Sequence, residues 1–335
     1  MSGMPEEPPI LPFFEDTKNS PTSQSTSLMS TEWLLGLSDL PGIGNSRAIS
    51  LAKHFQYLER LQSADSLEIK SVVGTSKLDF SRVEPRFPMT EDDVQTVGYF
   101  DSNYPPGLRD LRDAPIVLWY RGNIPTQKSI AIVGTRNADD WGKSTTRRIS
   151  KVASSHGLAV ISGLALGVDT EAHIGCIEGG SPTVAILACD VRRPSPKSNS
   201  AMADEIIQNG GCLIAEVPLG TSTEGRNLVA RNRLQAAWAQ SLLVTQSGIP
   251  SGTLHTVRFA LELSRKLLVL KPPPNVHKSQ YEGNIALTSE FGFDLKILGG
   301  TKEFKEKLTK KKKVTDLDIG SISEFERFLV DVYGN

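Results

Sequence analysis

Short runs of apolar residues recur through the middle of the chain, and each run ends in glycine, hydroxyl or charged residues. Runs of about four to eight apolar residues are typical of buried strands, and the longer amphipathic stretches between them are typical of helices. The pattern predicts strands near 116–120, 129–134, 158–162, 182–188, 212–216, 241–246 and 266–270, the first as an edge strand. It predicts helices over 142–156, 167–178, 199–209, 226–239 and 252–265. This alternation predicts an α/β fold with a doubly wound, mostly parallel sheet.

The segments around this sheet differ from it in composition. Residues 1–30 are rich in Pro, Ser and Thr and predict a disordered leader, because they hold too few apolar positions to offset the entropy of ordering. Residues 31–95 predict a small helical domain, and the sheet domain is assigned to 96–300. Residues 301–335 predict a Lys-rich tail with a short helix.

Composition and charge narrow the class of protein. Lys and Arg number 37 against 38 Asp and Glu, so net charge argues neither for nor against a polyanionic partner. The three cysteines, Cys176, Cys189 and Cys212, lack metal-ligand spacing, so we expect no metal and a reducing cytoplasm. We expect no membrane contact, because no apolar run approaches the roughly 20 residues that span a bilayer and no secretory signal is visible.

The predicted helical domain contains a short glycine turn. Thr31 is a candidate cap for its first helix, and residues 41–44 match the turn of a helix-hairpin-helix motif. Gly42 and Gly44 would let backbone N–H groups approach a phosphate closely, so they are candidate contacts for duplex DNA. The motif is short, and a plain connection between two helices is an equally weighted alternative.

Glycine, hydroxyl and cationic residues gather where the predicted strands end. In doubly wound sheets ligands bind beyond the carboxyl ends of the strands, so these residues predict one phosphate-binding crevice. The turn at Gly134 lacks the G-x-G-x-x-G fingerprint and the Walker lysine, which disfavours a nicotinamide or ATP site. The candidate phosphate-binding residues are Gly134, Thr135, Arg136, Gly163, Lys197, Asn199, Arg231, Asn232, Arg233, Ser251, Gly252 and Thr253.

Asp169 and His173 lie four residues apart and share one face of a predicted helix. A metal site would need further ligands, to which the sequence does not point. We therefore predict structural hydrogen bonding for this pair, with Asp169 as the N-cap of its helix.

The region from about 97 to 293 resembles the DprA/Smf family of DNA-processing proteins. The resemblance rests on the order and spacing of the blocks at 104–108, 115–122, 133–136, 162–173, 231–233 and 251–256. It implies an extended Rossmann-like fold, preceded by a helix-hairpin-helix or SAM-like module, that binds single-stranded DNA without catalytic residues or a cofactor. It also implies a homodimer that helps load a RecA-type recombinase during DNA uptake and natural transformation.

The chain departs from the family pattern at several positions. Ser195 replaces the tyrosine of a Tyr-Pro-x-x-Asn turn that ends here at Asn199, so an aromatic that could stack on a base is missing. Leu228 and Val229 replace a Phe-Pro pair, and Thr245 replaces an acidic residue. The family's phosphate contacts are therefore expected in this chain more than its base stacking. A role in genome maintenance or defence stays an alternative to transformation.

A nucleotide-processing enzyme is the rival hypothesis. Residues 251–253 resemble the phosphate loop of lysine-decarboxylase-like phosphoribohydrolases, which share this superfamily. Such an enzyme needs a glutamate close behind the loop, and the nearest is Glu262, with Asp169 as a second candidate base. A purely structural partner-binding module would leave the converging arginines unexplained. The sequence therefore favours a binding protein.

Overall fold

The computed structural model describes all residues except 1–25, 92, 276, 290–294, 310–313 and 335. Most of the predicted leader thus lies outside the described residues. Leu28 is fully buried and its N–H donates to the Gln56 carbonyl at 2.8 Å, so the end of the predicted leader belongs to the helical domain. The first helix is capped by Ser30, whose hydroxyl accepts from the Trp33 N–H, and not by Thr31.

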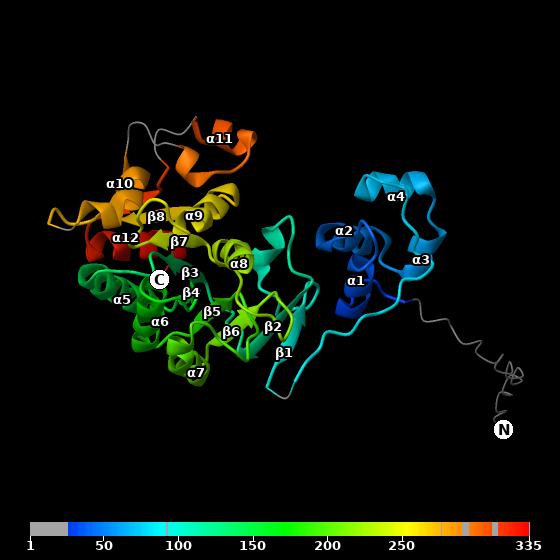
Figure 1. Cartoon of the computed structure of the whole chain (residues 1–335), viewed down its shortest axis with the longest axis horizontal. Helices are drawn as coiled ribbons and strands as arrows, with labels where there is room; N and C mark the ends of the chain where they lie inside the picture. The colour runs from blue at the N-terminus through cyan, green and yellow to red at the C-terminus, as the bar shows by residue number, and fades with distance from the viewer. Residues whose placement is uncertain (1–25, 92, 276, 290–294, 310–313, 335) are drawn as a thin grey trace, which may run out of the picture.

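Four short helices form the N-terminal domain. Figure 1 shows them in blue beside one edge of the sheet. Lys53 Nζ donates to the Tyr99 hydroxyl at 2.8 Å, and Asn45 Nδ2 donates to the Ala114 carbonyl at 3.4 Å, so the domain is attached to the sheet domain by polar contacts. The helices are α1 (Thr31–Ser38), α2 (Asn45–Phe55), α3 (Leu58–Ser63) and α4 (Ser66–Val73).

Nine strands form one sheet within the described residues, in the order β1-β2-β6-β5-β4-β3-β7-β8-β9. The β1–β2 and β2–β6 pairs are antiparallel, and the other pairs are parallel. All seven predicted strands are present. The strands are β1 (Gln95–Gly98), β2 (Val117–Gly122), β3 (Ser129–Val133), β4 (Ala159–Ser162), β5 (Thr183–Leu187), β6 (Cys212–Ala215), β7 (Ser241–Val244), β8 (Lys266–Leu270) and β9 (Leu317–Ile319).

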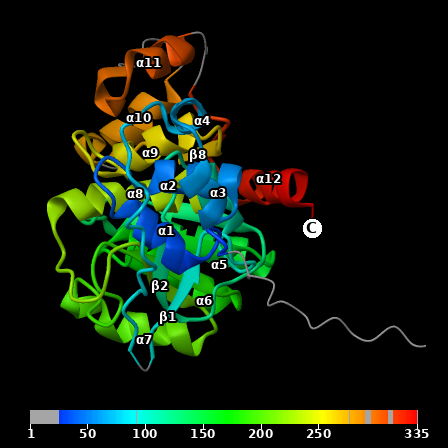
Figure 2. The same ribbon diagram turned by 90° about the vertical axis from the view of Figure 1, so that its right-hand side faces the viewer.

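Helices cover both faces of the sheet. Figures 1 and 2 show α5, α6 and α7 on one face and α8 and α9 on the other, as right-handed crossovers require when the strand order reverses after β6. The predicted α/β class and doubly wound sheet are thereby confirmed. The helices are α5 (Asp140–Ser155), α6 (Val168–Gly179), α7 (Ser200–Gln208), α8 (Gly225–Trp238), α9 (Thr253–Glu262), α10 (Glu282–Thr288), α11 (Lys302–Thr309) and α12 (Ile322–Tyr333).

Successive apolar residues of β3, β4, β7 and β8 pack in different hydrophobic clusters. In β3, Ile130 and Ile132 pack in the cluster that contains residues of α5, α6 and α12, whereas Ala131 and Val133 pack in the cluster that contains residues of α8 and α9. Side chains of a strand alternate between the two faces, so a strand buried on both faces is a continuous apolar run. This explains why apolar runs identified these strands.

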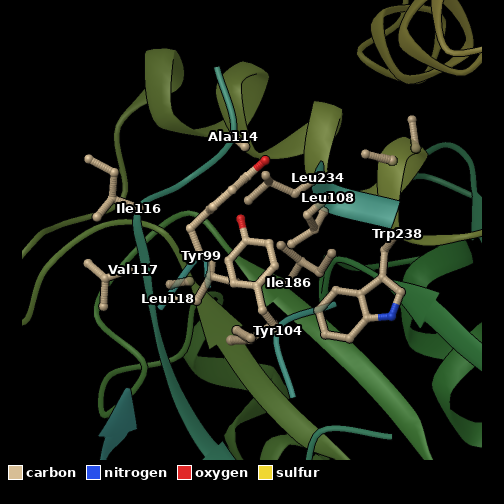
Figure 3. Packing of buried hydrophobic residues seen from close by; sticks show 14 of the residues in the cluster. Tyr99, Tyr104, Leu108, Ala114, Ile116, Val117, Leu118, Ile186, Leu234 and Trp238 are labelled. Carbon is tan, nitrogen blue, oxygen red and sulfur yellow. The ribbon is translucent and has the colours of Figure 1, made fainter. Parts of the chain in front are cut away.

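The block at 104–108 has a structural function. Tyr104 is buried among Leu108, Leu234 and Trp238, as Figure 3 shows, and its hydroxyl donates to the Pro115 carbonyl at 2.8 Å. A Cβ atom on Gly107 would lie 2.2 Å from the Ala237 carbonyl oxygen, so only glycine allows this close approach to the end of α8. The block therefore fixes α8, which carries Arg231, against the sheet domain.

Two predictions about the sheet edges are wrong. The predicted edge strand β2 lies between β1 and β6, because the unpredicted strand β1 pairs with it on the outer side. The segment 301–335 is more than a tail, since it supplies β9, which pairs with β8, and α12, which packs on α5. Near its end the Tyr333 hydroxyl donates to the Ser129 carbonyl at 3.1 Å.

Candidate functional site

The reversal of strand order creates a crevice between β3 and β7. These neighbouring strands are parallel, and the chain leaves them on opposite faces, through α5 and α9. Doubly wound sheets bind ligands at such a switch point. The Thr135 N–H donates to the Gln246 carbonyl at 2.8 Å, which joins the two loops that leave the strands.

Gly134 is required by the packing at this switch point. A Cβ atom there would lie 2.5 Å from Cγ2 of Val168 and 2.8 Å from the Gln246 carbonyl oxygen. The missing side chain therefore lets the loop after β3 lie between α6 and the loop after β7. The reason for glycine at this position is the approach of these two segments, whereas the sequence predicted a tight turn.

A cavity of about 440 Å³ opens at the crevice. The loops after β3 and β7 and one face of α8 line it, so segments that are distant in sequence converge as expected. The sequence-predicted residues that line this cavity are Gly134, Thr135, Arg136, Arg231, Asn232, Ser251, Gly252 and Thr253.

The loop before α9 lines the cavity and contains a backbone amide group without a partner among the described residues. The Gly252 N–H makes no hydrogen bond within the described residues, and the Asn232 side chain holds the loop by donating to the Gly252 carbonyl at 3.3 Å. Neither φ, at −60°, nor a neighbouring atom requires glycine at position 252, because no atom lies within 4 Å of an added Cβ. The glycine leaves the start of α9 open to an anion, which a helix N-terminus favours.

Arg136 is exposed at the rim of the cavity. Its side chain makes no hydrogen bond or ion pair with any described residue. An arginine in this position can donate a pair of N–H groups to a phosphate without giving up an existing partner.

Arg231, in contrast, is a buried side chain with 5% exposure. Its Nη1 donates to the Gly163 carbonyl at 2.8 Å and to the Ile186 carbonyl, and burial lowers its pKa despite the nearby Asp169. Gly163 is itself buried, and a Cβ there would lie 2.1 Å from Nη1. The structure thus gives Gly163 the role of making room for Arg231, whose guanidinium joins β4 and β5.

Five other predicted contact residues lie outside this cavity. Arg233 forms ion pairs with Asp113 at 3.0 Å and Glu216 at 2.6 Å and lines a second cavity. Asn199 is buried and donates to the Leu164 carbonyl at 2.9 Å, so it supports the loop after β4. Lys197 is exposed but does not line the cavity. Gly42 and Gly44 are exposed in the helical domain, in the turn between α1 and α2.

Asp169 and His173 make the structural hydrogen bonds that were predicted. Asp169 accepts from the Ala165 N–H at 3.3 Å, and His173 Nε2 accepts from the Leu164 N–H at 3.3 Å. The N-cap of α6 is Gly167, however, so the predicted cap at Asp169 is wrong. Burial raises the pKa of Asp169, and the Arg231 charge partly offsets this effect.

We expect His173 to make the fold sensitive to acid. Burial, with a smaller contribution from Arg231, lowers its pKa from 6.5 to about 3. The unfolded chain therefore takes up a proton below pH 6.5 that the folded chain refuses until about pH 3, so stability is lost as the pH falls through this range. At pH 5 this amounts to about 2 kcal/mol of the free energy of unfolding. Urea titrations at pH 7 and 5 should show this difference for the wild type and not for His173→Gln.

A matched control is the exposed His54. A His54→Gln variant tests whether the loss of any histidine, rather than of the buried one, changes the free energy of unfolding. If the His173→Gln variant loses as much stability between pH 7 and 5 as the wild type, other groups cause the acid sensitivity.

Sequence reasoning missed two polar residues of the cavity, Gln235 and Thr256. Both are 2% exposed and line the cavity from α8 and α9. A helical signal was present, because Gln235 follows Arg231 by four residues and Thr256 follows Gly252 by four. Both residues lie inside helices and not at the ends of strands, where the candidate residues were expected.

Comparison with known proteins identifies the class. Residues 95–292 match the model of the DNA recombination-mediator protein A family. Protein Smf of Synechocystis sp. is 30% identical over 261 residues, covering 73% of this chain and 65% of Smf. DprA of Streptococcus pneumoniae is 30% identical over 172 residues, covering 51% of this chain and 60% of DprA. The chain spans less than two thirds of the length of these relatives.

Two solved structures share the fold. DprA of Streptococcus pneumoniae superposes with a TM-score of 0.57 at 20% identity, covering 80% of this chain and 100% of that one. DNA processing protein A of Helicobacter pylori gives 0.56 at 23% identity, covering 71% and 96%. The fold and the matched region define a member of a family of DNA-processing proteins, with a Rossmann-like sheet. The chain belongs to the DprA/Smf family, as its resemblance predicted.

The described part of the chain offers neither a membrane span nor a metal cluster. Its helices are all too short or too polar to cross a bilayer. The same residues contain no group of three or more His, Cys, Asp or Glu side chains suited to a metal ion.

Proposed function

We propose that the chain binds single-stranded DNA at the crevice between β3 and β7 and acts as a recombination mediator. The observation that carries this proposal is the convergence of Arg136, unpaired within the described residues, with the open amide of Gly252 on one cavity. The Helicobacter pylori neighbour is described as binding single-stranded DNA, which supports the same ligand class here.

Membership of the family supports a proposal for the cellular role. We propose that the protein works in the cytoplasm as a homodimer that helps a RecA-type recombinase assemble on single strands, as in natural transformation. Light scattering tests the dimer, and recombinase filament assembly on strands coated with single-strand-binding protein tests the loading. A monomer, or an assembly rate that the protein does not change, would remove the corresponding part of the proposal.

We expect single strands to bind at least about tenfold more tightly than a blunt duplex of equal length, which corresponds to about 1.4 kcal/mol. The cavity between two helices and a loop can receive one flexible single-stranded backbone. The backbone of a duplex is stiff and cannot bend into it. Fluorescence anisotropy with labelled oligonucleotides of mixed sequence measures both affinities. Equal affinities would contradict the crevice site.

Gly44→Asp separates the two candidate DNA sites. A Cβ atom added at Gly44 meets no atom within 4 Å, so the fold should tolerate the substitution, while the carboxylate of the aspartate would repel a phosphate at the turn. We expect single-strand binding to be unchanged in this variant. A loss of duplex binding would assign duplex contacts to the turn at 41–44.

A nucleotide hydrolase is the second candidate function, and we expect no turnover. Glu262, one candidate base, lines the second cavity and lies 3.7 Å from Arg258, away from the loop before α9. Asp169 alone among the described residues of the first cavity carries a carboxylate. Chromatography after incubation with nucleoside mono- and triphosphates should show no release of base or phosphate. Product that disappears in Asp169→Asn would support the hydrolase instead.

A further inference from the structure

A short segment outside the cavity contacts both of the loops that leave β3 and β7. It consists of η3 (Lys278–Tyr281) and α10, which follow β8 in the chain, and Figure 1 shows α10 beside that strand. Tyr281, Gly283 and Asn284 are buried in this segment, and none of the three lines the cavity. Their contacts therefore act on the loops and not directly on a ligand.

Tyr281 contacts the loop after β3. Its hydroxyl donates to Oδ1 of Asp139 at 2.8 Å, and its ring centroid lies 5.8 Å from that of Trp141. Asp139 ends this loop as the N-cap of α5, where the same oxygen accepts from the Gly142 N–H at 2.7 Å. Burial, followed by the bond to Asp139, raises the pKa of Tyr281, so its hydroxyl keeps its proton and remains the donor. Because Asp139 follows Arg136 by three residues, Tyr281 fixes the end of the segment that carries this arginine.

Asn284 and its neighbour Gly283 hold the loop after β7. The carboxamide oxygen of Asn284 accepts from the Ser247 N–H at 2.7 Å. The carboxamide nitrogen donates to the Thr245 and Leu270 carbonyls at 3.0 and 2.9 Å. The Gly283 N–H donates to the Ser247 carbonyl at 2.8 Å, and a Cβ atom on Gly283 would also lie 2.8 Å from that oxygen. Glycine therefore allows α10 to approach the start of the loop that leads to α9.

Gln246 bonds the two loops to each other. Its carbonyl accepts from the Thr135 N–H at 2.8 Å, and its Oε1 accepts from the Asp139 N–H at 3.2 Å. Gln246, Tyr281 and Asn284 are each 0% exposed, and apart from Nε2 of Gln246 their side-chain polar atoms have partners within the described residues. Satisfied polar networks in a protein interior specify one geometry, which apolar packing of the same space would not do. The network therefore sets the spacing of the two loops.

We propose that η3 and α10 hold the loops after β3 and β7 at the spacing that a bound strand requires, with Tyr281 and Asn284 as positioning residues. Arg136 and the Gly252 N–H lie on different loops and have to contact one strand together. A site that already has its binding geometry loses less entropy when the ligand binds, so its affinity is higher. This inference rests on the proposed function, because it concerns the same strand.

Tyr281→Phe tests the first loop, because it removes one hydroxyl and keeps the ring. We expect the full-length variant to bind a labelled single strand about three- to fivefold more weakly than the wild type at low salt, within the range for one hydrogen bond. Fluorescence anisotropy measures this change. Wild-type affinity of Tyr281→Phe would overturn the inference.

Tyr333→Phe is the matched control. The Tyr333 hydroxyl is also buried and donates to the Ser129 carbonyl, at the opposite end of the same strand β3. Its removal should lower the stability of the protein and leave the affinity for the strand unchanged. Equal losses of affinity in the two variants would assign the effect to general stability and overturn a positioning role.

The coupling between Tyr281 and Arg136 is a readout that a merely structural role would not change. If Tyr281 acts by placing Arg136, then Tyr281→Phe should change the affinity by less than about twofold in the Arg136→Ala background, because the two effects are not additive. The full three- to fivefold loss in that background would overturn the assignment of Tyr281 to this loop.

Hydrogen exchange followed by mass spectrometry tests both loops in the absence of DNA. Tyr281→Phe should speed deuterium uptake in residues 134–142, and Asn284→Ala in residues 245–253, each by about two- to tenfold for one lost hydrogen bond. Uptake in β5 should stay the same. If Asn284→Ala does not fold, Gly283→Ala replaces it, because the added Cβ pushes α10 away from Ser247. Unchanged uptake in both loops would overturn the inference, whereas a wild type that binds no single strand would refute the proposed function.

Discussion

Arg231→Ala is expected to lower the free energy of unfolding by about 2–6 kcal/mol, because it leaves two buried carbonyl groups without their donor, at about 1–3 kcal/mol each. The variant leaves the Gly163 and Ile186 carbonyls without their common donor and leaves the carboxyl group of Asp169 buried without a nearby cation. It also leaves a void beside Gly163, where the guanidinium of Arg231 packs in the wild type. Urea titration followed by circular dichroism measures the loss of stability.

Arg231→Lys is the informative control for this variant. Lysine keeps the charge but cannot reproduce the planar guanidinium, so we expect it to restore only part of the stability. Unchanged stability of Arg231→Ala, combined with weaker DNA binding and a flatter salt dependence, would show that Arg231 contacts phosphate, as the sequence first suggested.

Arg136→Ala is expected to have the opposite profile, with unchanged stability and single-strand affinity lowered about tenfold at low salt, the order of a hydrogen bond to a charged group. Its side chain is exposed and unpaired within the described residues, so its removal leaves the fold intact. The slope of log affinity against log salt should fall by about 0.7, because the variant neutralises one phosphate fewer. Anisotropy titrations at several salt concentrations provide both values.

Arg148 supplies the comparison for Arg136. It is also exposed, on α5, but does not line the cavity. Arg148→Ala should therefore leave the slope and the affinity nearly unchanged. Equal effects of the two variants would mean that general surface charge, and not the rim of the cavity, holds the strand.

The central strands were predictable because each is buried on both faces and reads as a continuous apolar run. The edge strands β1 and β9 were not, because β1 is buried over only half of its length and lacks a continuous apolar run, and β9 has only three residues. β9 contains the residues Leu317, Asp318 and Ile319, too few for a periodic pattern.

The strand-end loops of the site were predictable from their glycines, but the direction of side chains on α8 was not. Arg231 and Arg233 are two residues apart, and such positions do not share a helix face. One accordingly points toward β4 and β5, and the other reaches Asp113 and Glu216. Burial also decides between a phosphate contact and a structural contact, and it depends on tertiary packing that local sequence does not contain.

The attachment of α12 has a consequence for how the chain folds. Lys128 Nζ donates to the Tyr333 carbonyl, and the Tyr333 hydroxyl donates to the Ser129 carbonyl, across 205 and 204 residues of sequence. Interactions of such long range slow folding, because a large loop must close before they form. During synthesis the start of β3 gains these partners only after Tyr333 has been made. Until then β3 lacks part of its packing against α12.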